Sequence, residues 1–416
     1  MSINSLKTAI TIPICVVFAL PALLFAQARK LDTTTFVVLG EGLAAGMADY
    51  GLSVNVQDFS FPAQMARQMK TIFPQPLIQG PGLETMFGLP TPQARVPTYP
   101  QTTVRIFPAN PFKPAGAVDG PTLFVFNLSL PNWRLADSLS LRPTWPAVQA
   151  DNPRQTSINL ILGTPSLILN NNVPLWTQLE YAQAMNPTLA LVELGYYEAL
   201  HAAASGNPDL IPDPATFRNN YATVVKSLRE LYTEVVVTTI PDPTGAAYFI
   251  PPATARRLLR ADDSLLNRYG VPPGDFLTRP GLFAISNQVF KGTFAGLPEG
   301  SILRASTAAD IRARVNALNA VINTVARENG AVVYDLGAFF AGLRANGVNA
   351  GGRTLTADYL GGFYSLDGVY PSITGHGLIA NDILRLLNTT YGRSFLPVNL
   401  TPLLALDPAL SAKAPQ

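Results

Sequence analysis

The chain contains only two histidines, His201 and His376, so only two imidazoles could take up a proton near neutral pH. His201 lies in the segment Glu198–Ala202, and His376 lies at the predicted start of the last helix. A protonated imidazole there would face the positive end of the helix dipole, which is unfavourable. We therefore interpret both histidines as structural or solvent-facing. His376 is the better alternative base, because it lies six residues beyond Tyr370.

A serine nucleophile would need such a base beside it. The serines closest to the segments that could form a site are Ser53, Ser60, Ser129, Ser365 and Ser372. Ser60 precedes Phe61 and Pro62, a pattern typical of a helix N-cap followed by a proline in the first turn. We interpret the other four as loop hydroxyls that bond to the backbone.

Apolar, β-rich runs alternate with helical patterns along the chain, which is typical of parallel α/β proteins. The predicted strands are Thr35–Leu39, Thr122–Asn127, Thr188–Leu194, Glu234–Ile240 and Ala331–Leu336. The sequence therefore predicts a three-layer α/β/α sandwich around a mainly parallel five-stranded sheet, with long irregular insertions. Right-handed crossovers would place the carboxyl ends of the strands at one rim.

Three helices carry clear apolar stripes. The first, Ala215–Leu231, follows Asp213 and Pro214 and places Phe217, Tyr221, Val224 and Leu228 on one face. The second, Thr307–Asn329, has Ser306 as its expected N-cap and Gly330 as its stop, with Ile311, Val315, Leu318, Ile322 and Val325 facing inward. Thr374 is the expected cap of the last helix, whose inward residues would be Ile379, Ile383 and Leu387.

Four short segments lie in order at the ends of these strands or just before helices. They are Val37–Leu43, Phe126–Asn132, Val192–Glu198 and Leu366–Ser372. Their order and spacing resemble the four conserved blocks of the SGNH/GDSL hydrolase family, over nearly the whole chain beyond residue 28. In that family the blocks supply a nucleophilic Ser, an oxyanion-hole Gly, an oxyanion-hole Asn, and an Asp with a His.

The catalytic positions that the resemblance implies are substituted in this chain. Gly42 stands in the Ser position, Asn132 in the Gly position, Tyr197 in the Asn position and Tyr370 in the His position. Only Asp367 remains of the triad. Glycine has no side chain that could attack, and a tyrosine with an ordinary pKa near 10 is a poor base near neutral pH. Tyr197 could still donate one hydrogen bond to an oxyanion. We therefore expect a catalytically silent member of the family.

Three carboxylates, Glu41, Glu198 and Asp367, would converge at the rim if the blocks are placed as the resemblance implies. Paired carboxylates can hydrolyse glycosides or hold a hard cation. The alternative is that these acids only bond to loop backbone, and we favour it. We expect no cofactor and no metal site.

The composition is poor in charge, with 13% charged and 48% hydrophobic residues and a net charge of +2. Without a basic run or a nucleic-acid motif, binding to nucleic acid is not expected. A surface short of charge favours apolar contact with partners or membrane.

The first 28 residues resemble an export signal. Lys7 precedes an uncharged run over residues 9–25, and Ala26–Ala28 supplies an A-x-A cleavage site. The alternative is an uncleaved N-terminal membrane anchor, because a helix of about 17 residues spans roughly 25 Å. We favour cleavage, since Pro13 and Pro21 disfavour a regular helix. The only cysteine, Cys15, lies in this run, so the mature chain would form no disulfide. An exported protein, whether periplasmic, cell-surface or secreted, is expected.

Residues 29–416 are predicted to form a single domain with two insertions, at about 74–121 and 241–305, and an extended tail at 394–416. Both insertions are rich in proline and leave from strand ends. In an enzyme they would form lids and acyl-chain pockets; here we interpret them, with the tail, as a docking surface. The candidate aromatic anchors are Phe87, Tyr99, Phe107, Phe112, Tyr248, Phe249 and Phe276. The alternative is that these aromatics cover the protein's own core.

The sequence thus predicts an exported binding or structural subunit of the cell envelope, with a protein partner or a lipid or glycan ligand. The alternative is an active exported ester or acyl hydrolase that uses displaced residues such as His376.

Overall fold

A parallel sheet lies at the centre of the computed structural model, which describes residues 30–78, 104–105, 124–149, 151–168 and 173–411. Its strands, in spatial order, are β1 (Phe36–Gly40), β4 (Leu189–Glu193), β5 (Glu234–Thr238) and β9 (Val332–Tyr334). β1 and β4 are buried along their whole length, as expected of strands covered on both faces. The predicted α/β class with a parallel sheet is confirmed. The predicted signal or anchor at 1–28 lies outside the described residues.

The predicted five-stranded sheet is wrong by one strand. The segment before Asn127 approaches β1 but pairs with it only at one parallel bridge, between Val38 and Asn127. Beyond that bridge the amide of Gln178 donates to the carbonyls of Gly40 and Leu128, at 3.0 and 2.8 Å. The carbonyl of Leu128 is thereby occupied by a side chain and no regular ladder forms, although the N–H of Leu130 still donates to the carbonyl of Gly40 at 3.3 Å.

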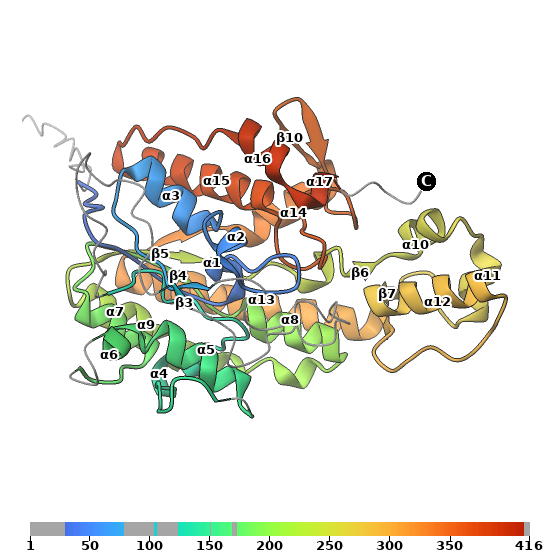
Figure 1. Cartoon of the computed structure of the whole chain (residues 1–416), viewed down its shortest axis with the longest axis horizontal. Coiled ribbons are helices and arrows are strands. Elements are labelled where there is room, and N and C mark those ends of the chain that lie inside the picture. The colour runs from blue at the N-terminus through green and yellow to red at the C-terminus, as the bar shows by residue number, and fades with distance from the viewer. Residues whose placement is uncertain (1–29, 79–103, 106–123, 150, 169–172, 412–416) are drawn as a thin grey trace, which may run out of the picture.

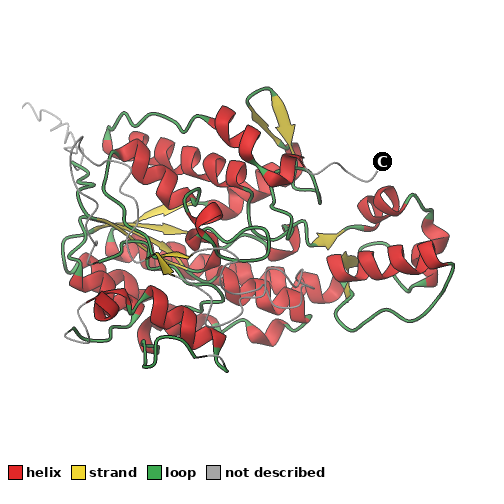
Figure 2. Ribbon diagram, in the orientation of Figure 1, coloured by secondary structure: helices red, strands yellow, loops and turns green. Residues whose placement is uncertain are grey.

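Helices cover both faces of the sheet, which gives the three layers seen in Figures 1 and 2. On one face, α3 (Phe61–Met69) packs against α15 (Ile373–Tyr391). On the other lie α7 (Gln178–Ala184), α8 (Tyr196–Ser205), α9 (Pro214–Arg229) and α13 (Ala305–Asn329). The inward stripes predicted for α9, α13 and α15 are all buried.

Two of the predicted helix caps are wrong. Helix α13 begins at Ala305 rather than after Ser306, because the carboxylate of Asp275 accepts its first N–H, 2.8 Å away. Helix α15 is capped by Ser372, whose hydroxyl accepts from the N–H of Gly375. Thr374 instead donates its N–H to Asp407. In both helices a carboxylate distant in sequence binds the free N–H, which a search for local caps cannot find.

The second insertion, predicted to be irregular, is a small folded subdomain. It contains the antiparallel sheet β6-β7-β8, formed by Phe249–Ile250, Phe276–Thr278 and Ile302–Leu303. Its helices are α10 (Pro252–Leu259), α11 (Asp263–Arg268) and α12 (Arg279–Lys291). Ile250, Leu266, Leu277 and Ile285 are among the buried residues of a separate hydrophobic cluster. The subdomain projects from the body of the molecule (Figure 1).

Most of the first insertion lies outside the described residues, including Phe87, Tyr99, Phe107 and Phe112. Its described ends form an antiparallel pair, β2 (Leu77–Ile78) with β3 (Val104–Arg105). The tail packs along the body, as predicted, through α16 (Leu400–Leu406) and α17 (Pro408–Ser411). Its Leu403 and Ala409 are buried.

Short elements connect these layers. They are α1 (Gly42–Ala45), α2 (Val54–Gln57), α4 (Asp137–Ser140), α5 (Pro153–Ile161), α6 (Thr164–Ile168), α14 (Leu336–Asn346), the hairpin β10 (Val348–Ala350) and β11 (Arg353–Leu355), and 3₁₀ turns at Pro208–Leu210 and Pro243–Gly245. In the part of the chain that the structure describes, no helix is both long and apolar enough to cross a bilayer.

Candidate functional site

Strand β1 delivers Glu41 and Gly42 to the rim of the sheet. The strand ends at Gly40, and the side chain of Glu41 caps α1 by accepting the N–H of Leu43 at 2.6 Å. Gly42 is the first residue of that helix and is buried. The backbone therefore has the strand-turn-helix form that could present a side chain at position 42 to a substrate.

The space that a side chain at position 42 would need is filled by Tyr370. A Cβ built on Gly42 would lie 2.5 Å from the Tyr370 hydroxyl and 2.7 Å from the sulfur of Met47. The same hydroxyl donates a hydrogen bond to Glu41, 3.0 Å away. The positions expected for nucleophile and base are thus in contact, but a buried phenol occupies the volume of the nucleophile.

Asp367 binds backbone rather than an imidazole. Its carboxylate accepts the N–H groups of Val369 and Tyr370, at 2.7 and 3.0 Å, and that of Tyr50 at 3.4 Å. Burial raises the pKa of the Asp367 carboxyl to about 6, although these hydrogen bonds oppose the shift. Asp367 therefore holds the turn that carries Tyr370.

The third block places two tyrosines at the start of α8, after Gly195 with a φ of 110°. The ring of Tyr196 meets Tyr370 edge to face, with centroids 6.5 Å apart. The ring of Tyr197 stacks on that of His201, with centroids 5.5 Å apart.

Asn132 adopts a left-handed backbone, with a φ of 53°. Glycine adopts this conformation at little cost, and asparagine is one of the few other residues that visit it readily. The second block is joined to the third by Glu198, whose carboxylate accepts the N–H of Leu135 at 2.7 Å. The turn geometry expected of a glycine position is kept, with a polar side chain added.

Sequence reasoning overlooked Glu193, the last residue of β4. Its carboxylate accepts the N–H groups of Glu41 and Ala44, at 3.3 and 3.2 Å, and so joins the first block to the third. Burial raises its pKa well above the ordinary range, with the charge of Glu41 as the next cause. An acid ending an otherwise apolar strand was the available signal.

Glu41 and Glu198 have pKa values raised to about 7, in both cases mainly by burial. The carboxylates Glu41, Glu198 and Asp367 each accept backbone N–H groups, as the alternative interpretation expected. Within the described ranges, no three His, Cys, Asp or Glu side chains are grouped so that they could hold a metal ion. These acids hold loops together at the rim.

Each histidine has a contact of its own. His376 is fully buried, and its Nδ1 accepts the N–H of Phe61 at 3.3 Å. Burial lowers its pKa to about 3. His201 lies 3.4 Å from the guanidinium of Arg134, and burial followed by that charge lowers its pKa.

Three of the five candidate serines accept hydrogen bonds from the backbone. Ser60 caps α3, as predicted, and Ser365 and Ser372 accept backbone N–H groups. The prediction was wrong for Ser129, whose buried hydroxyl has no hydrogen-bond partner among the described residues. Ser53 precedes α2 without a capping bond from its side chain.

The comparisons with known proteins find distant structural likeness alone. The chain matches no protein-family model and no curated protein. TesA has 12% identity and a TM-score of 0.35, with 85% of this chain and 98% of that chain covered. An acetyl xylan esterase has 11% identity, a TM-score of 0.34, and coverage of 85% and 98%. The lipase/acylhydrolase from Enterococcus faecalis has 13% identity, a TM-score of 0.34, and coverage of 87% and 97%. Similarity this low says nothing about the activity of this chain.

Proposed function

We propose that this chain is an exported, catalytically silent SGNH-hydrolase-like protein that acts by binding, as a subunit or receptor in the cell envelope. The four blocks resemble those of the hydrolases in order and position at the rim. Their substituted residues are now used for packing and for hydrogen bonds to the backbone.

The observation that carries the proposal is the contact between Gly42 and Tyr370. A serine at position 42 would overlap the phenol, and the phenol is held in place by Glu41. A serine triad needs a hydroxyl that is hydrogen-bonded to an imidazole, which is in turn hydrogen-bonded to a carboxylate. Here a glycine, a tyrosine and a backbone-bound aspartate stand at those positions.

A displaced triad has little support in the geometry. His376 would be the base, but its Nδ1 already accepts a backbone N–H from Phe61. Its lowered pKa also makes it a weak proton acceptor at neutral pH.

A serine-directed fluorophosphonate tests this proposal, with an active serine esterase as the positive control. We expect no labelling of the folded protein at neutral pH and no turnover of a chromogenic short-chain ester. Stoichiometric labelling of one serine, with turnover abolished by its Ser→Ala change, would establish the alternative of an active hydrolase.

The envelope role rests on the composition of residues 1–28 and on the charge-poor surface. Fractionation of the native organism with an antibody to the folded body should find the protein outside the cytoplasm. Recovery of an uncleaved chain in the cytoplasm alone would contradict it.

A further inference from the structure

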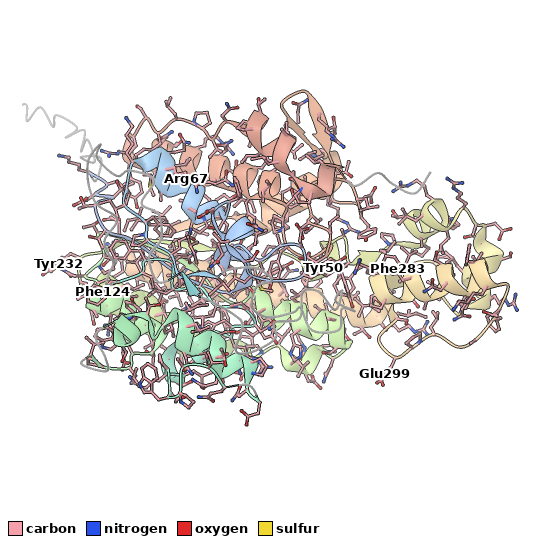
Figure 3. The ribbon with its side chains drawn as sticks, in the orientation of Figure 1. Tyr50, Arg67, Phe124, Tyr232, Phe283 and Glu299 are labelled. Atoms are coloured by element: carbon pink, nitrogen blue, oxygen red, sulfur yellow. The ribbon has the colours of Figure 1, made fainter. Side chains whose placement is uncertain are left out.

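The subdomain exposes a cluster of large apolar side chains. Phe283, Val289, Phe290 and Phe294 are 42, 49, 90 and 48% exposed, and all lie on α12 or the loop after it. Figure 3 shows Phe283 on the part of the molecule that projects from the body. The four residues, together with residues 279–297 that carry them, are called the α12 face below.

This exposure is not a consequence of an incomplete subdomain core. Leu282 and Ile285 of α12 are buried in the cluster that contains Leu266 and Leu277, whereas Phe283 and Phe290, seven residues apart, share an open side of the helix. Helix α12 thus packs some of its apolar side chains into the subdomain core and leaves others exposed to solvent. Phe290, the most exposed, is surrounded by the exposed residues Val289 and Lys291.

Basic side chains surround the α12 face. The guanidinium of Arg268 lies 4.0 Å from the ring centroid of Phe294, and that of Arg279 lies 4.8 Å from Phe283. Among the residues that the structure describes, Arg260, Arg268 and Lys291 form no ion pair with an acid.

The positive charge of the chain is concentrated in this subdomain. Residues 249–304 contain seven basic and four acidic residues, a net charge of +3, whereas the whole chain carries +2. The rest of the chain therefore has a net charge of −1, and the projecting subdomain is the part that an anionic surface would attract.

We propose that the α12 face docks onto the surface of an anionic phospholipid bilayer. Phe290 and Val289 would enter the boundary between headgroups and acyl chains, while Arg260, Arg268 and Lys291 would contact lipid phosphates. Exposed aromatic side chains with basic residues beside them, here Lys291 on α12 and Arg268 on α11, are typical of interfacial membrane binding.

A bilayer fits the observations better than a protein groove. A residue that is 90% exposed stands out from the surface rather than lining a cavity. It lies near the end of α12, in the subdomain that projects from the body and could reach a plane without bringing the body into contact (Figure 1). The inference rests on the proposed function only for the location of the protein at the envelope, since docking needs no hydrolysis.

An environment-sensitive fluorophore at the face tests this directly in the full chain. Cys15→Ser removes the native thiol, and Asn287→Cys places the label on the exposed side of α12. The matched control is Tyr232→Cys, because Tyr232 is 95% exposed and lies at the opposite end of the molecule (Figure 3). The probes are vesicles of neutral phosphatidylcholine and vesicles that also contain phosphatidylglycerol.

We expect a blue shift and a gain in intensity at position 287 with anionic vesicles alone, weakened by salt, and no change at position 232. Phe290→Ser in the Asn287→Cys background should weaken the apparent affinity roughly ten-fold, because burial of one phenylalanine is lost. A site-specific signal is needed, since the N-terminal segment could tether the whole protein.

An unchanged label at position 287 with both vesicles would overturn the proposal, and so would an equal response to neutral vesicles that ignores Phe290→Ser. Labelling by the fluorophosphonate does not enter this test. Failure of membrane docking and failure of catalytic silence are therefore separate results.

Discussion

Gly42 is enclosed by two neighbouring side chains, those of Tyr370 and Met47, which leave no room for a Cβ. The Tyr370 hydroxyl and ring lie on one side, and the sulfur of Met47 lies on the other. The hydroxyl is itself fixed, because it donates to the carboxylate of Glu41 within the buried rim. The absence of a side chain at position 42 and the presence of a tyrosine at position 370 are therefore linked, because the Tyr370 phenol fills the space that a side chain at position 42 would need.

At this scale we expect Gly42→Ala to destabilise the protein by about 1–3 kcal/mol, the usual cost of overpacking a filled core. Urea unfolding followed by far-UV circular dichroism would measure it. The matched control is Gly342→Ala in α14, where an added Cβ meets no atom within 4 Å. That change should be neutral or stabilise by about 0.5–1 kcal/mol. Equal effects of the two substitutions would show that the Gly42 site is not closely packed.

A second prediction concerns the Tyr370 hydroxyl. Tyr370→Phe removes the donor to one buried oxygen of Glu41, while Leu43 still donates to the other. Leaving a buried acceptor without its partner costs about 1–3 kcal/mol. Tyr391→Phe is the control, because that hydroxyl donates to the partly buried Glu234 at 3.2 Å and should cost less. Urea midpoints for the two variants give the comparison, and a larger loss for Tyr391→Phe would contradict the prediction.

The sequence predicted the residue types at the rim but not their contacts. Order and spacing were enough to single out Gly42 and Tyr370 as equivalent positions in a site. The contact between them depends on how the loop after Asp367 folds, which is set by backbone bonds to Asp367 from three N–H groups. Two of these bonds are local, from Val369 and Tyr370, but the third joins Asp367 to Tyr50, 317 residues away, and no local pattern shows it.

At the scale of elements, two neighbouring strands are followed or ended by glutamates whose carboxyl groups are buried. Glu41 follows β1 and Glu193 ends β4, and these strands are neighbours in the sheet. Glu198 lies in the first turn of α8, where its charge also raises the pKa values of the other two. The arrangement is tolerated because backbone N–H groups bind at least one oxygen of each carboxylate and because the raised pKa values let protons remain bound.

This arrangement predicts that stability falls as pH rises from about 5 to about 7.5. Burial raises the folded-state pKa of Glu41 and of Glu198 from an ordinary 4.5 to about 7. Their contribution is complete below the unfolded pKa, falls by about 1.4 kcal/mol per pH unit for each group between the unfolded and folded values, and is gone once pH exceeds the folded value. The lowered pKa of His376 acts in the opposite direction, but only at pH values below the ordinary pKa of 6.5.

Urea unfolding at intervals over this pH range measures the slope. Glu41→Gln should flatten it, because a neutral amide can still accept from Leu43 and bond to Tyr370. Glu230→Gln on the surface of the molecule should leave it unchanged. A wild-type slope of zero, or one that rises with pH, would contradict the buried acids as its source.

Helices were easier to predict from sequence than strands or caps. The stripes of α9, α13 and α15 follow from the 3.6-residue period and need no knowledge of neighbours. The fifth strand failed because the amide of Gln178 competes for its acceptors. Tertiary contacts of this kind also moved the starts of α13 and α15.

At the scale of the whole molecule, the chain has a large core around the sheet and a small one in the subdomain. Tyr248 and Phe249, predicted as surface anchors, are buried in the large core, which makes that prediction wrong for both. Exposed aromatic area is instead found on α12, within the same insertion. Proline-rich composition did indicate a break in the sheet-helix alternation, but it could not show that the break contains a folded unit.

The subdomain is joined to the rim by Arg279, the first residue of α12. Its guanidinium donates to the hydroxyl of Tyr50 and to that of Tyr359. Tyr50 in turn donates its hydroxyl to the carbonyl of Leu366, beside Asp367. The projecting unit therefore rests on the same loop that holds Tyr370, although its apolar core is separate.

Two cores predict two responses to core truncation. Leu277 is fully buried in the small core, so Leu277→Ala should cost the subdomain about 2–5 kcal/mol. Because Leu277 belongs to the small core and not to the large one, amide exchange should accelerate over residues 249–303 while β4 stays protected. Ile322→Ala in α13 is the matched control, since it removes the same kind of volume from the large core. That change should raise exchange in the sheet as well. If Leu277→Ala accelerates exchange in β4 as much as in β7, the two cores unfold as one unit, and the subdomain cannot loosen at a membrane without the body.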